Sequence, residues 1–243
     1  MKAVLRWLGL VVIASVALQL FFVGRVALMA IADPESTTFQ RSEAWRITNE
    51  RDKLRWSQHW VPYAHISDNL KRAVIASEDS TFAEHDGVDW DALERAWARN
   101  EKAEERAARQ AQFAPMRARP PKIVGGSTIT QQLAKNLLLS GERNLLRKGQ
   151  EFVLTMALEH TLSKQRILEI YLNNVEWGEG VFGAEAAAQH YFRKPASRLT
   201  PYEAARLAVM LPQPKRFEKM PGSRYLAGRT ATIVARMSAA ELP

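Results

Sequence analysis

The chain has 243 residues, of which 47% are apolar, and its 34 Lys and Arg outnumber its 26 Asp and Glu to give a net charge of +8. That length is enough for one sizeable domain, and the basic surface favours anionic partners such as lipid headgroups, nucleic acid or phosphorylated substrates. Because the chain has no cysteine, disulfides, cysteine-ligated zinc and a thiol nucleophile are excluded.

The N-terminus predicts a membrane anchor over residues 1–32. Residues 7–24 carry no charge, and 18 residues are close to the length that crosses the hydrocarbon core as a helix. Lys2 and Arg6 precede this run, so the positive-inside rule places the N-terminus in the cytoplasm and the remainder outside. A cleaved signal peptide is the alternative, although the apolar run is longer than a usual signal core. Both interpretations export the rest of the chain.

Residues 33–66 are predicted to connect this anchor to the main domain. The stretch is mixed and polar, and its three tryptophans suit either the membrane interface or a protein core: Trp45, Trp56 and Trp60. From Ser67 onward the apolar spacing is helical, with Leu70, Val74 and Ile75 on one face. This helix runs into Glu78 and Asp79, an acidic pair that directly follows an apolar turn.

A second helix is predicted from Asp89 to about Arg109, with a late part so polar that it indicates a solvated helix or flap. The breaker-rich "FAPMRARPPK" then ends it. In "GGSTITQQLAKN", Thr128 and Gln131 match a capping box, which predicts that a helix begins there. On that helix Gln132 and Lys135 lie close together, three positions apart.

Four more amphipathic helices are predicted toward the C-terminus. They are "EFVLTMALEHTL", which Glu151 opens, then "KQRILEIYLNNV", "GAEAAAQHYF" and "TPYEAARLAVMLPQP", where Pro212 and Pro214 end the pattern. No alternating strand of useful length and no repeat is evident. The sequence therefore predicts a mainly α fold.

Two groups of residues could carry chemistry. Glu78 and Glu151 each adjoin apolar helix turns, where burial raises a carboxyl pKa and lets it exchange protons, and paired acids are the general solution for reactions at a sugar C1. Four cations follow the Gly125-Gly126 pair and would suit a diphosphate: Lys135, Arg143, Arg147 and Lys148. Solvated carboxylates, a tight glycine turn and a solvated basic face remain the alternatives.

Other chemistry finds little support in the sequence. The five histidines lack metal-ligand spacing, so no metal site is assigned. No Ser-x-x-Lys and no Lys-Thr-Gly occurs, which argues against a penicillin-binding acyl-transfer domain.

Five blocks together carry a resemblance to a known family. The blocks are "EDSTFAEHDG", "GGSTITQQLAKNLLLSGERN", "LLRKGQEFVLTMALE", "KQRILEIYLNNVEWGEGVFGAEAAAQHYF" and "KPASRLTPYEAARLAVMLPQP". Their order resembles the peptidoglycan glycosyltransferases of glycosyltransferase family 51, over roughly residues 67–217, and the chain looks like a monofunctional, single-anchor member from Gram-negative bacteria. The resemblance implies a lysozyme-like helical catalytic domain over residues 67–243, with a head and a jaw lobe, behind one transmembrane helix.

The resemblance also implies an activity. The enzyme would polymerise lipid II into glycan strands, transferring the growing undecaprenyl-pyrophosphate-linked chain to the GlcNAc 4-hydroxyl of lipid II with inversion and without transpeptidation. It would be a single-pass inner-membrane protein with a periplasmic catalytic domain. Its partners would be lipid II, the growing strand and cell-division or cell-wall synthesis proteins, not nucleic acid. No cofactor is required, although Mg²⁺ or Mn²⁺ is compatible with a diphosphate substrate.

Family roles fall on named positions of this sequence. Glu78 matches the general base, and Glu151 the second family glutamate, which would orient a cation or bound metal ion. Contacts to the diphosphate and sugars fall on Gln132, Lys135, Arg143 and Lys148, and the same cleft would be lined by Ser127, Thr128 and Asn136. Residues 100–122 correspond to a segment that covers the cleft in the family. In this sequence the segment is longer than expected and rich in charge.

Two rival functions stay open at this point. A membrane-anchored lytic glycan hydrolase of the same fold would also use a glutamate, but as an acid toward a glycosidic oxygen. A non-enzymatic exported scaffold would bind anionic lipid or nucleic acid through its basic face and would need neither glutamate.

Overall fold

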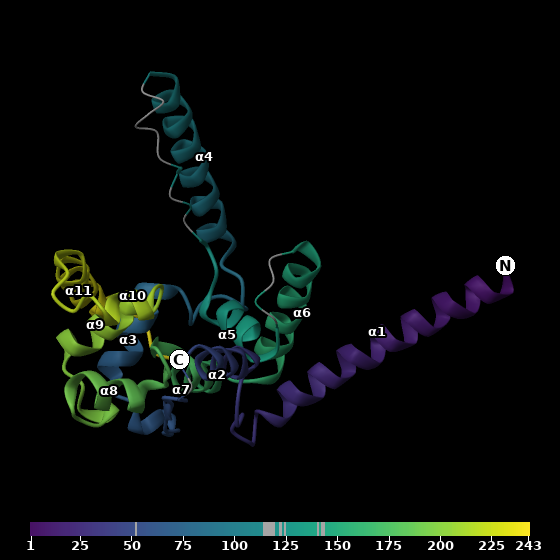
Figure 1. The fold of residues 1–243 in the computed structure, drawn as a ribbon, viewed down its shortest axis with the longest axis horizontal. Coiled ribbons are helices and arrows are strands. Elements are labelled where there is room, and N and C mark those ends of the chain that lie inside the picture. The colour runs from purple at the N-terminus through teal and green to yellow at the C-terminus, as the bar shows by residue number, and fades with distance from the viewer. Residues whose placement is uncertain (52, 114–119, 122, 124, 140, 142–143) are drawn as a thin grey trace.

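The computed structural model describes residues 1–51, 53–113, 120–121, 123, 125–139, 141 and 144–243. Its helices are α1 (Lys2–Leu28), α2 (Thr38–Arg51), α3 (Asp68–Glu78), α4 (Trp90–Phe113), α5 (Ile129–Leu138), α6 (Leu145–Thr161), α7 (Lys164–Asn174), α8 (Ala184–Phe192), α9 (Pro201–Met210), α10 (Pro214–Glu218) and α11 (Arg224–Arg236). Short 3₁₀ turns are η1 (Tyr63–His65), η3 (Ala196–Arg198) and η4 (Met237–Ala239). The mainly α prediction is confirmed, and Figure 1 shows these helices gathered into one body from which α1 and α4 project.

One small sheet crosses the helical body. It has the order β1-β3-β2, in which β3 (Val181–Phe182) pairs in parallel with β1 (Ser57–Gln58) and antiparallel with β2 (Glu176–Gly178). Strands of two or three residues cannot display an alternating pattern, which is why the sequence did not predict them. The turn between β2 and β3 needs glycine, because Gly180 has φ +73° and an added Cβ would lie 2.0 Å from the Arg55 carbonyl oxygen.

The core lies where α3, α5, α7 and α9 meet. Leu70, Val74 and Ile75 of α3 are fully buried, as their spacing predicted, and α3 packs against α9, which in turn packs against α11. The largest wholly enclosed side chains include Trp177 and Tyr171. Tyr171 matters for the site, because its ring is part of the core while its hydroxyl donates a hydrogen bond to Gln132 of α5.

The predicted connector is more structured than expected. Fourteen of its residues form α2, which packs against α5. There the Thr38 hydroxyl donates a 3.0 Å hydrogen bond to the Leu137 carbonyl. Trp45 is exposed, whereas the Trp56 ring stacks on Phe182 with centroids 4.4 Å apart and Trp60 packs against the core. This segment therefore forms a wall of the main body.

Several helix bounds also differ from the predictions. α6 begins at Leu145, so Glu151 lies in its second turn and does not open it. Asn144 caps this helix, since its side chain accepts a 2.7 Å hydrogen bond from the Arg147 backbone. α4 continues to Phe113, and α10 and α11 follow the prolines where no helix was predicted.

The C-terminal end of helix α1 joins the body, and the rest of the helix extends away from it (Figure 1). It is long and apolar enough to cross a membrane, and its apolar window is not buried against the rest of the chain. Near the body α1 contacts α6, where Gln19 and Gln150 exchange hydrogen bonds of 2.7 and 3.0 Å, and Val26 is fully buried.

Candidate active site

The start of helix α5 is tied to the acidic segment that follows α3. Thr128 and Gln131 form the predicted capping box. The Thr128 hydroxyl also donates a 2.6 Å hydrogen bond to the Gly87 carbonyl, and Asp79 Oδ2 accepts 2.9 Å from the Ile129 amide. Asp79 thus places a negative charge at the helix N-terminus, where it is stabilised. These contacts fix the position of Glu78 relative to α5.

His85 shapes the same turn. Its Nδ1 accepts a 3.1 Å hydrogen bond from the Gly87 amide, and its Nε2 lies 2.9 Å from Asp79 Oδ1. Because Nδ1 is an acceptor, the proton of the neutral ring is on Nε2, which donates to Asp79. Both oxygens of Asp79 are therefore occupied, and Asp79 is a structural neighbour of Glu78.

Glu78 lies at the C-terminal end of α3, where its hydrogen-bond donors among the described residues are neutral. Its Oε2 accepts 3.2 Å from Gln132 Nε2, and its Oε1 accepts 3.3 Å from the Ser77 hydroxyl. The Tyr171 hydroxyl donates 3.0 Å to Gln132 Oε1, which orients the amide so that its NH₂ faces Glu78. Burial raises the pKa of Glu78 above its usual 4.5, although Gln132 and Ser77 partly oppose this rise.

Glu151 has a different environment. The residue is only 4% exposed and accepts hydrogen bonds from two cations on its own helix: Arg147, whose Nη1 lies 2.9 Å from Oε2, and Lys148 at Oε1. Spacings of three and four positions bring these side chains to the same helix face. Arg147 Nε is buried and has no hydrogen-bond partner among the described residues, so one strong donor of this group is unused.

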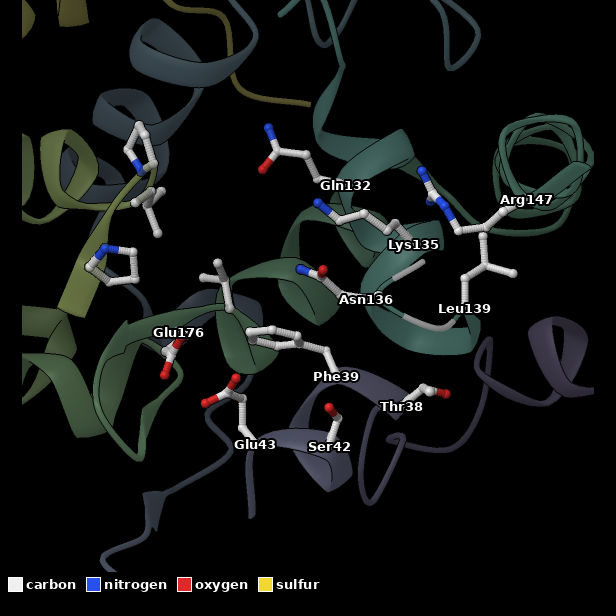
Figure 2. A pocket seen from close by; sticks show the side chains of 15 residues that line it. Thr38, Phe39, Ser42, Glu43, Gln132, Lys135, Asn136, Leu139, Arg147 and Glu176 are labelled. Atoms are coloured by element: carbon white, nitrogen blue, oxygen red, sulfur yellow. The ribbon is translucent and has the colours of Figure 1, made fainter. Parts of the chain in front are cut away.

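A groove of about 580 Å³ lies beside these residues (Figure 2). α2, α5, the β2 region and the turn after α9 contribute its walls, which are lined by Thr38, Phe39, Ser42, Glu43, Gln132, Lys135, Asn136, Leu139, Gly141, Arg147, Val175, Glu176, Leu211, Pro212 and Pro214. A smaller hollow of about 200 Å³ is lined by Ser127, Gln131, Gln132, Lys135, Arg147, Lys148 and Glu151. Three residues line both: Gln132, Lys135 and Arg147.

Two carboxylates face the groove opposite α5 (Figure 2). Burial tends to raise the pKa of Glu43, but hydrogen bonds from Arg46 and Lys215 outweigh it and hold that pKa below 4.5. Burial raises the pKa of Glu176 to about 7, and Lys215, whose Nζ is 3.5 Å from Glu176 Oε1, offsets only part of the rise.

Comparison with known proteins decides the family. Residues 46–238 match the family described as Transglycosylase. The chain belongs to the transglycosylase family. It is 51% identical over 246 residues to the biosynthetic peptidoglycan transglycosylase of Burkholderia thailandensis, an alignment that covers all of this chain and 90% of that protein. The protein of the same name from Paraburkholderia xenovorans is 50% identical over 242 residues, covering 98% of this chain and 94% of its own.

In this transglycosylase, most of the predicted site residues converge. Glu78 touches Gln132, which shares the hollow with Glu151 and with Ser127, Lys135 and Lys148, while Asn136 lines the larger groove. Thr128 is buried, and its hydroxyl is engaged in the capping box and with Gly87, so its side chain faces the protein. Arg143 lies outside the described residues.

Three residues of the site were not assigned to it from the sequence: Arg147, Glu43 and Glu176. Arg147 was counted only as one of several cations, although its spacing of four from Glu151 was a usable signal. No signal in the sequence pointed to Glu43 or Glu176, because α2 and β2 meet the groove only through tertiary packing. Within the described ranges, no three His, Asp or Glu side chains are grouped as a metal site.

Proposed function

We propose that the chain polymerises lipid II, moving the growing undecaprenyl-pyrophosphate-linked strand onto the GlcNAc 4-hydroxyl of an incoming lipid II with inversion at C1. The names of the relatives support peptidoglycan as the product class. The observation that carries the proposal is the position of Glu78, a carboxylate with a raised pKa bonded to a glutamine that also lines the cationic groove.

In the proposed reaction Glu78 is the general base. The acceptor 4-hydroxyl gives its proton to the Glu78 carboxylate while its oxygen forms a bond to C1 of the donor sugar. The bond between C1 and the diphosphate oxygen breaks from the opposite face, and the diphosphate leaves with the electron pair. A positioned base contributes roughly 10²–10⁴-fold to such a step. The raised pKa suits this role, because a base works best when its pKa approaches the working pH.

The cations of α5 and α6 would hold the departing diphosphate. Lys135 and Arg147 line both the groove and the hollow, and Arg147 Nε offers a buried donor without a partner in the described part of the chain. Fixed donors aimed at developing negative charge are a large source of transition-state stabilisation. Glu151 would keep Arg147 and Lys148 in place. A divalent cation such as Mg²⁺ or Mn²⁺ would enter this scheme with the diphosphate.

We further propose that the protein is a single-pass inner-membrane enzyme whose catalytic domain faces the periplasm. The lone candidate span in the described ranges, α1, and the positive charges before it support this orientation. At the start of α6, which α1 contacts, Leu145 and Leu146 are 90% and 87% exposed, as suits a surface that meets lipid. Lipid-linked substrates would then reach the groove from the bilayer.

The proposal is tested with the purified full-length chain in detergent or vesicles, incubated with lipid II. We expect glycan polymer that still carries the lipid diphosphate at one end and no cross-linked peptides. A lytic hydrolase would leave lipid II unchanged and cut preformed glycan, and a scaffold would do neither. Either of those two results would overturn the proposal.

A further inference from the structure

The wall of the groove opposite α5 contains a buried carboxylate with an unpartnered oxygen atom. Glu176, the first residue of β2, is only 6% exposed, and its Oε1 accepts no hydrogen bond from the described residues. The nearest cation, Lys215, is 3.5 Å from Oε1 and already bonds Glu43. An unmatched buried polar group costs free energy, so its retention calls for an explanation such as a ligand.

Glu176 differs in this respect from the other acid on the same wall. Glu43 accepts hydrogen bonds from Arg46 and Lys215, all of them at its Oε2. Burial instead raises the pKa of Glu176 to about 7, because Lys215, 3.5 Å from Oε1, offsets only part of the effect of burial. Glu176 is thus the acid on this wall with a buried oxygen that accepts no close hydrogen bond from the described residues.

The groove has two chemically different sides. Gln132, Lys135 and Arg147 lie on the α5 and α6 side and Glu176 lies across from them. The apolar ring of Phe39 lies between the two sides (Figure 2). The groove of about 580 Å³ combines apolar side chains with convergent polar groups, as ligand sites do. If a diphosphate lies on the cationic side, the sugars attached to it extend toward Glu176.

We propose that Glu176 is a saccharide-binding residue, whose carboxylate accepts a hydrogen bond from a hydroxyl or an acetamide N–H of the growing strand. The inference deepens the proposed function and rests on it, because the diphosphate sets the direction in which the strand lies. The contact would hold the strand in the groove between successive transfers. Its loss would therefore shorten the polymer as well as weaken binding.

Two substitutions separate the kinds of donor that Glu176 could meet. Glu176→Leu removes every acceptor, whereas Glu176→Gln keeps a neutral acceptor of the same size. Loss of a hydrogen bond to a charged group typically weakens binding roughly tenfold or more. A hydroxyl or amide donor would still bond the glutamine oxygen, but an ammonium group, such as one on a peptide, would lose its charge partner.

Glu179→Gln is the matched control. Glu179 belongs to the same acidic cluster, since it lies 3.3 Å from Arg46, but it lines a different cavity and not the groove. All three variants would be compared with the wild type for binding of lipid II and of a prenyl diphosphate without sugars, and for polymer length. Thermal unfolding of each would verify the fold.

We expect Glu176→Leu to weaken lipid II binding roughly tenfold, to leave prenyl diphosphate binding unchanged and to shorten the polymer, with Glu176→Gln close to wild type. Unchanged lipid II binding and length in both variants would overturn the inference, as would equal loss for both ligands. Glutamine as weak as leucine would assign the site to an ammonium group and overturn the saccharide assignment. Failure of the wild type to polymerise lipid II at all would instead refute the proposed function.

Discussion

Glu151 is buried and Glu78 is partly exposed, and the partners of the two glutamates differ in kind. Glu151 accepts hydrogen bonds from two cations, Arg147 and Lys148, whereas within the described residues Glu78 accepts only from the neutral groups of Gln132 and Ser77. A carboxylate bonded to two cations on its own helix serves as an anchor that holds them in place. A buried carboxylate among neutral donors has its pKa raised and can take up a proton. Burial is the main cause of the raised pKa of Glu78, and no cation among the described residues forms a hydrogen bond that opposes it.

The largest effect expected from this contrast is that of Glu78→Gln on the reaction rate. The amide cannot accept the proton of the acceptor hydroxyl, so the polymerisation rate should fall roughly 10²–10⁴-fold. Initial rates on lipid II would measure it, and Glu84→Gln, an exposed acid in the following turn, is the control. A near-wild-type rate in the Glu78 variant would show that Glu78 is not the general base.

Glu151→Gln should act mainly on stability. The change leaves Arg147 largely buried without its carboxylate, and breaking such a pair costs roughly 3–5 kcal/mol. The low end applies, because Lys148 is 52% exposed and can turn to solvent. Thermal unfolding should show a Tm lowered by several degrees. Glu78→Gln should not lower the Tm, since Glu78 is partly exposed and no cation among the described residues forms a hydrogen bond with it. An equal loss of Tm in both variants would contradict the proposed difference between Glu151, which is bonded to cations, and Glu78, which is bonded to neutral groups.

The smallest effect concerns pH. A general base acts only when deprotonated, so activity should rise as pH increases through the raised pKa of Glu78, above the usual 4.5. The Gln132 hydrogen bond lowers that pKa, so Gln132→Leu should move the acidic limb of the kcat/KM profile to higher pH. Gln132 also lines the groove, so its loss should lower kcat/KM at every pH. The pH at which the acidic limb falls, and not the height of the profile, is therefore the readout. A limb that stays in place would show that Gln132 does not tune Glu78.

Features that depend on neighbours in the sequence could be read from it. The capping box of α5, the buried stripe of α3 and the apolar span of α1 each follow from the spacing of adjacent side chains, and the structure contains all three. The order of the five blocks similarly identified the family. The Asn144 cap of α6 was also local and could have placed the start of that helix correctly.

The tertiary structure alone decided which side chains meet. Glu78 and Gln132 are 54 positions apart, and Tyr171 joins them from α7. Helix α2 closes the groove from a stretch predicted as a connector, and Glu176 reaches it from a strand of three residues, too short to show a period. Periodicity reports which face of an element is buried, but not the element against which it packs. That choice depends on the fit of distant surfaces, and it determines whether a carboxylate meets a cation or only neutral donors.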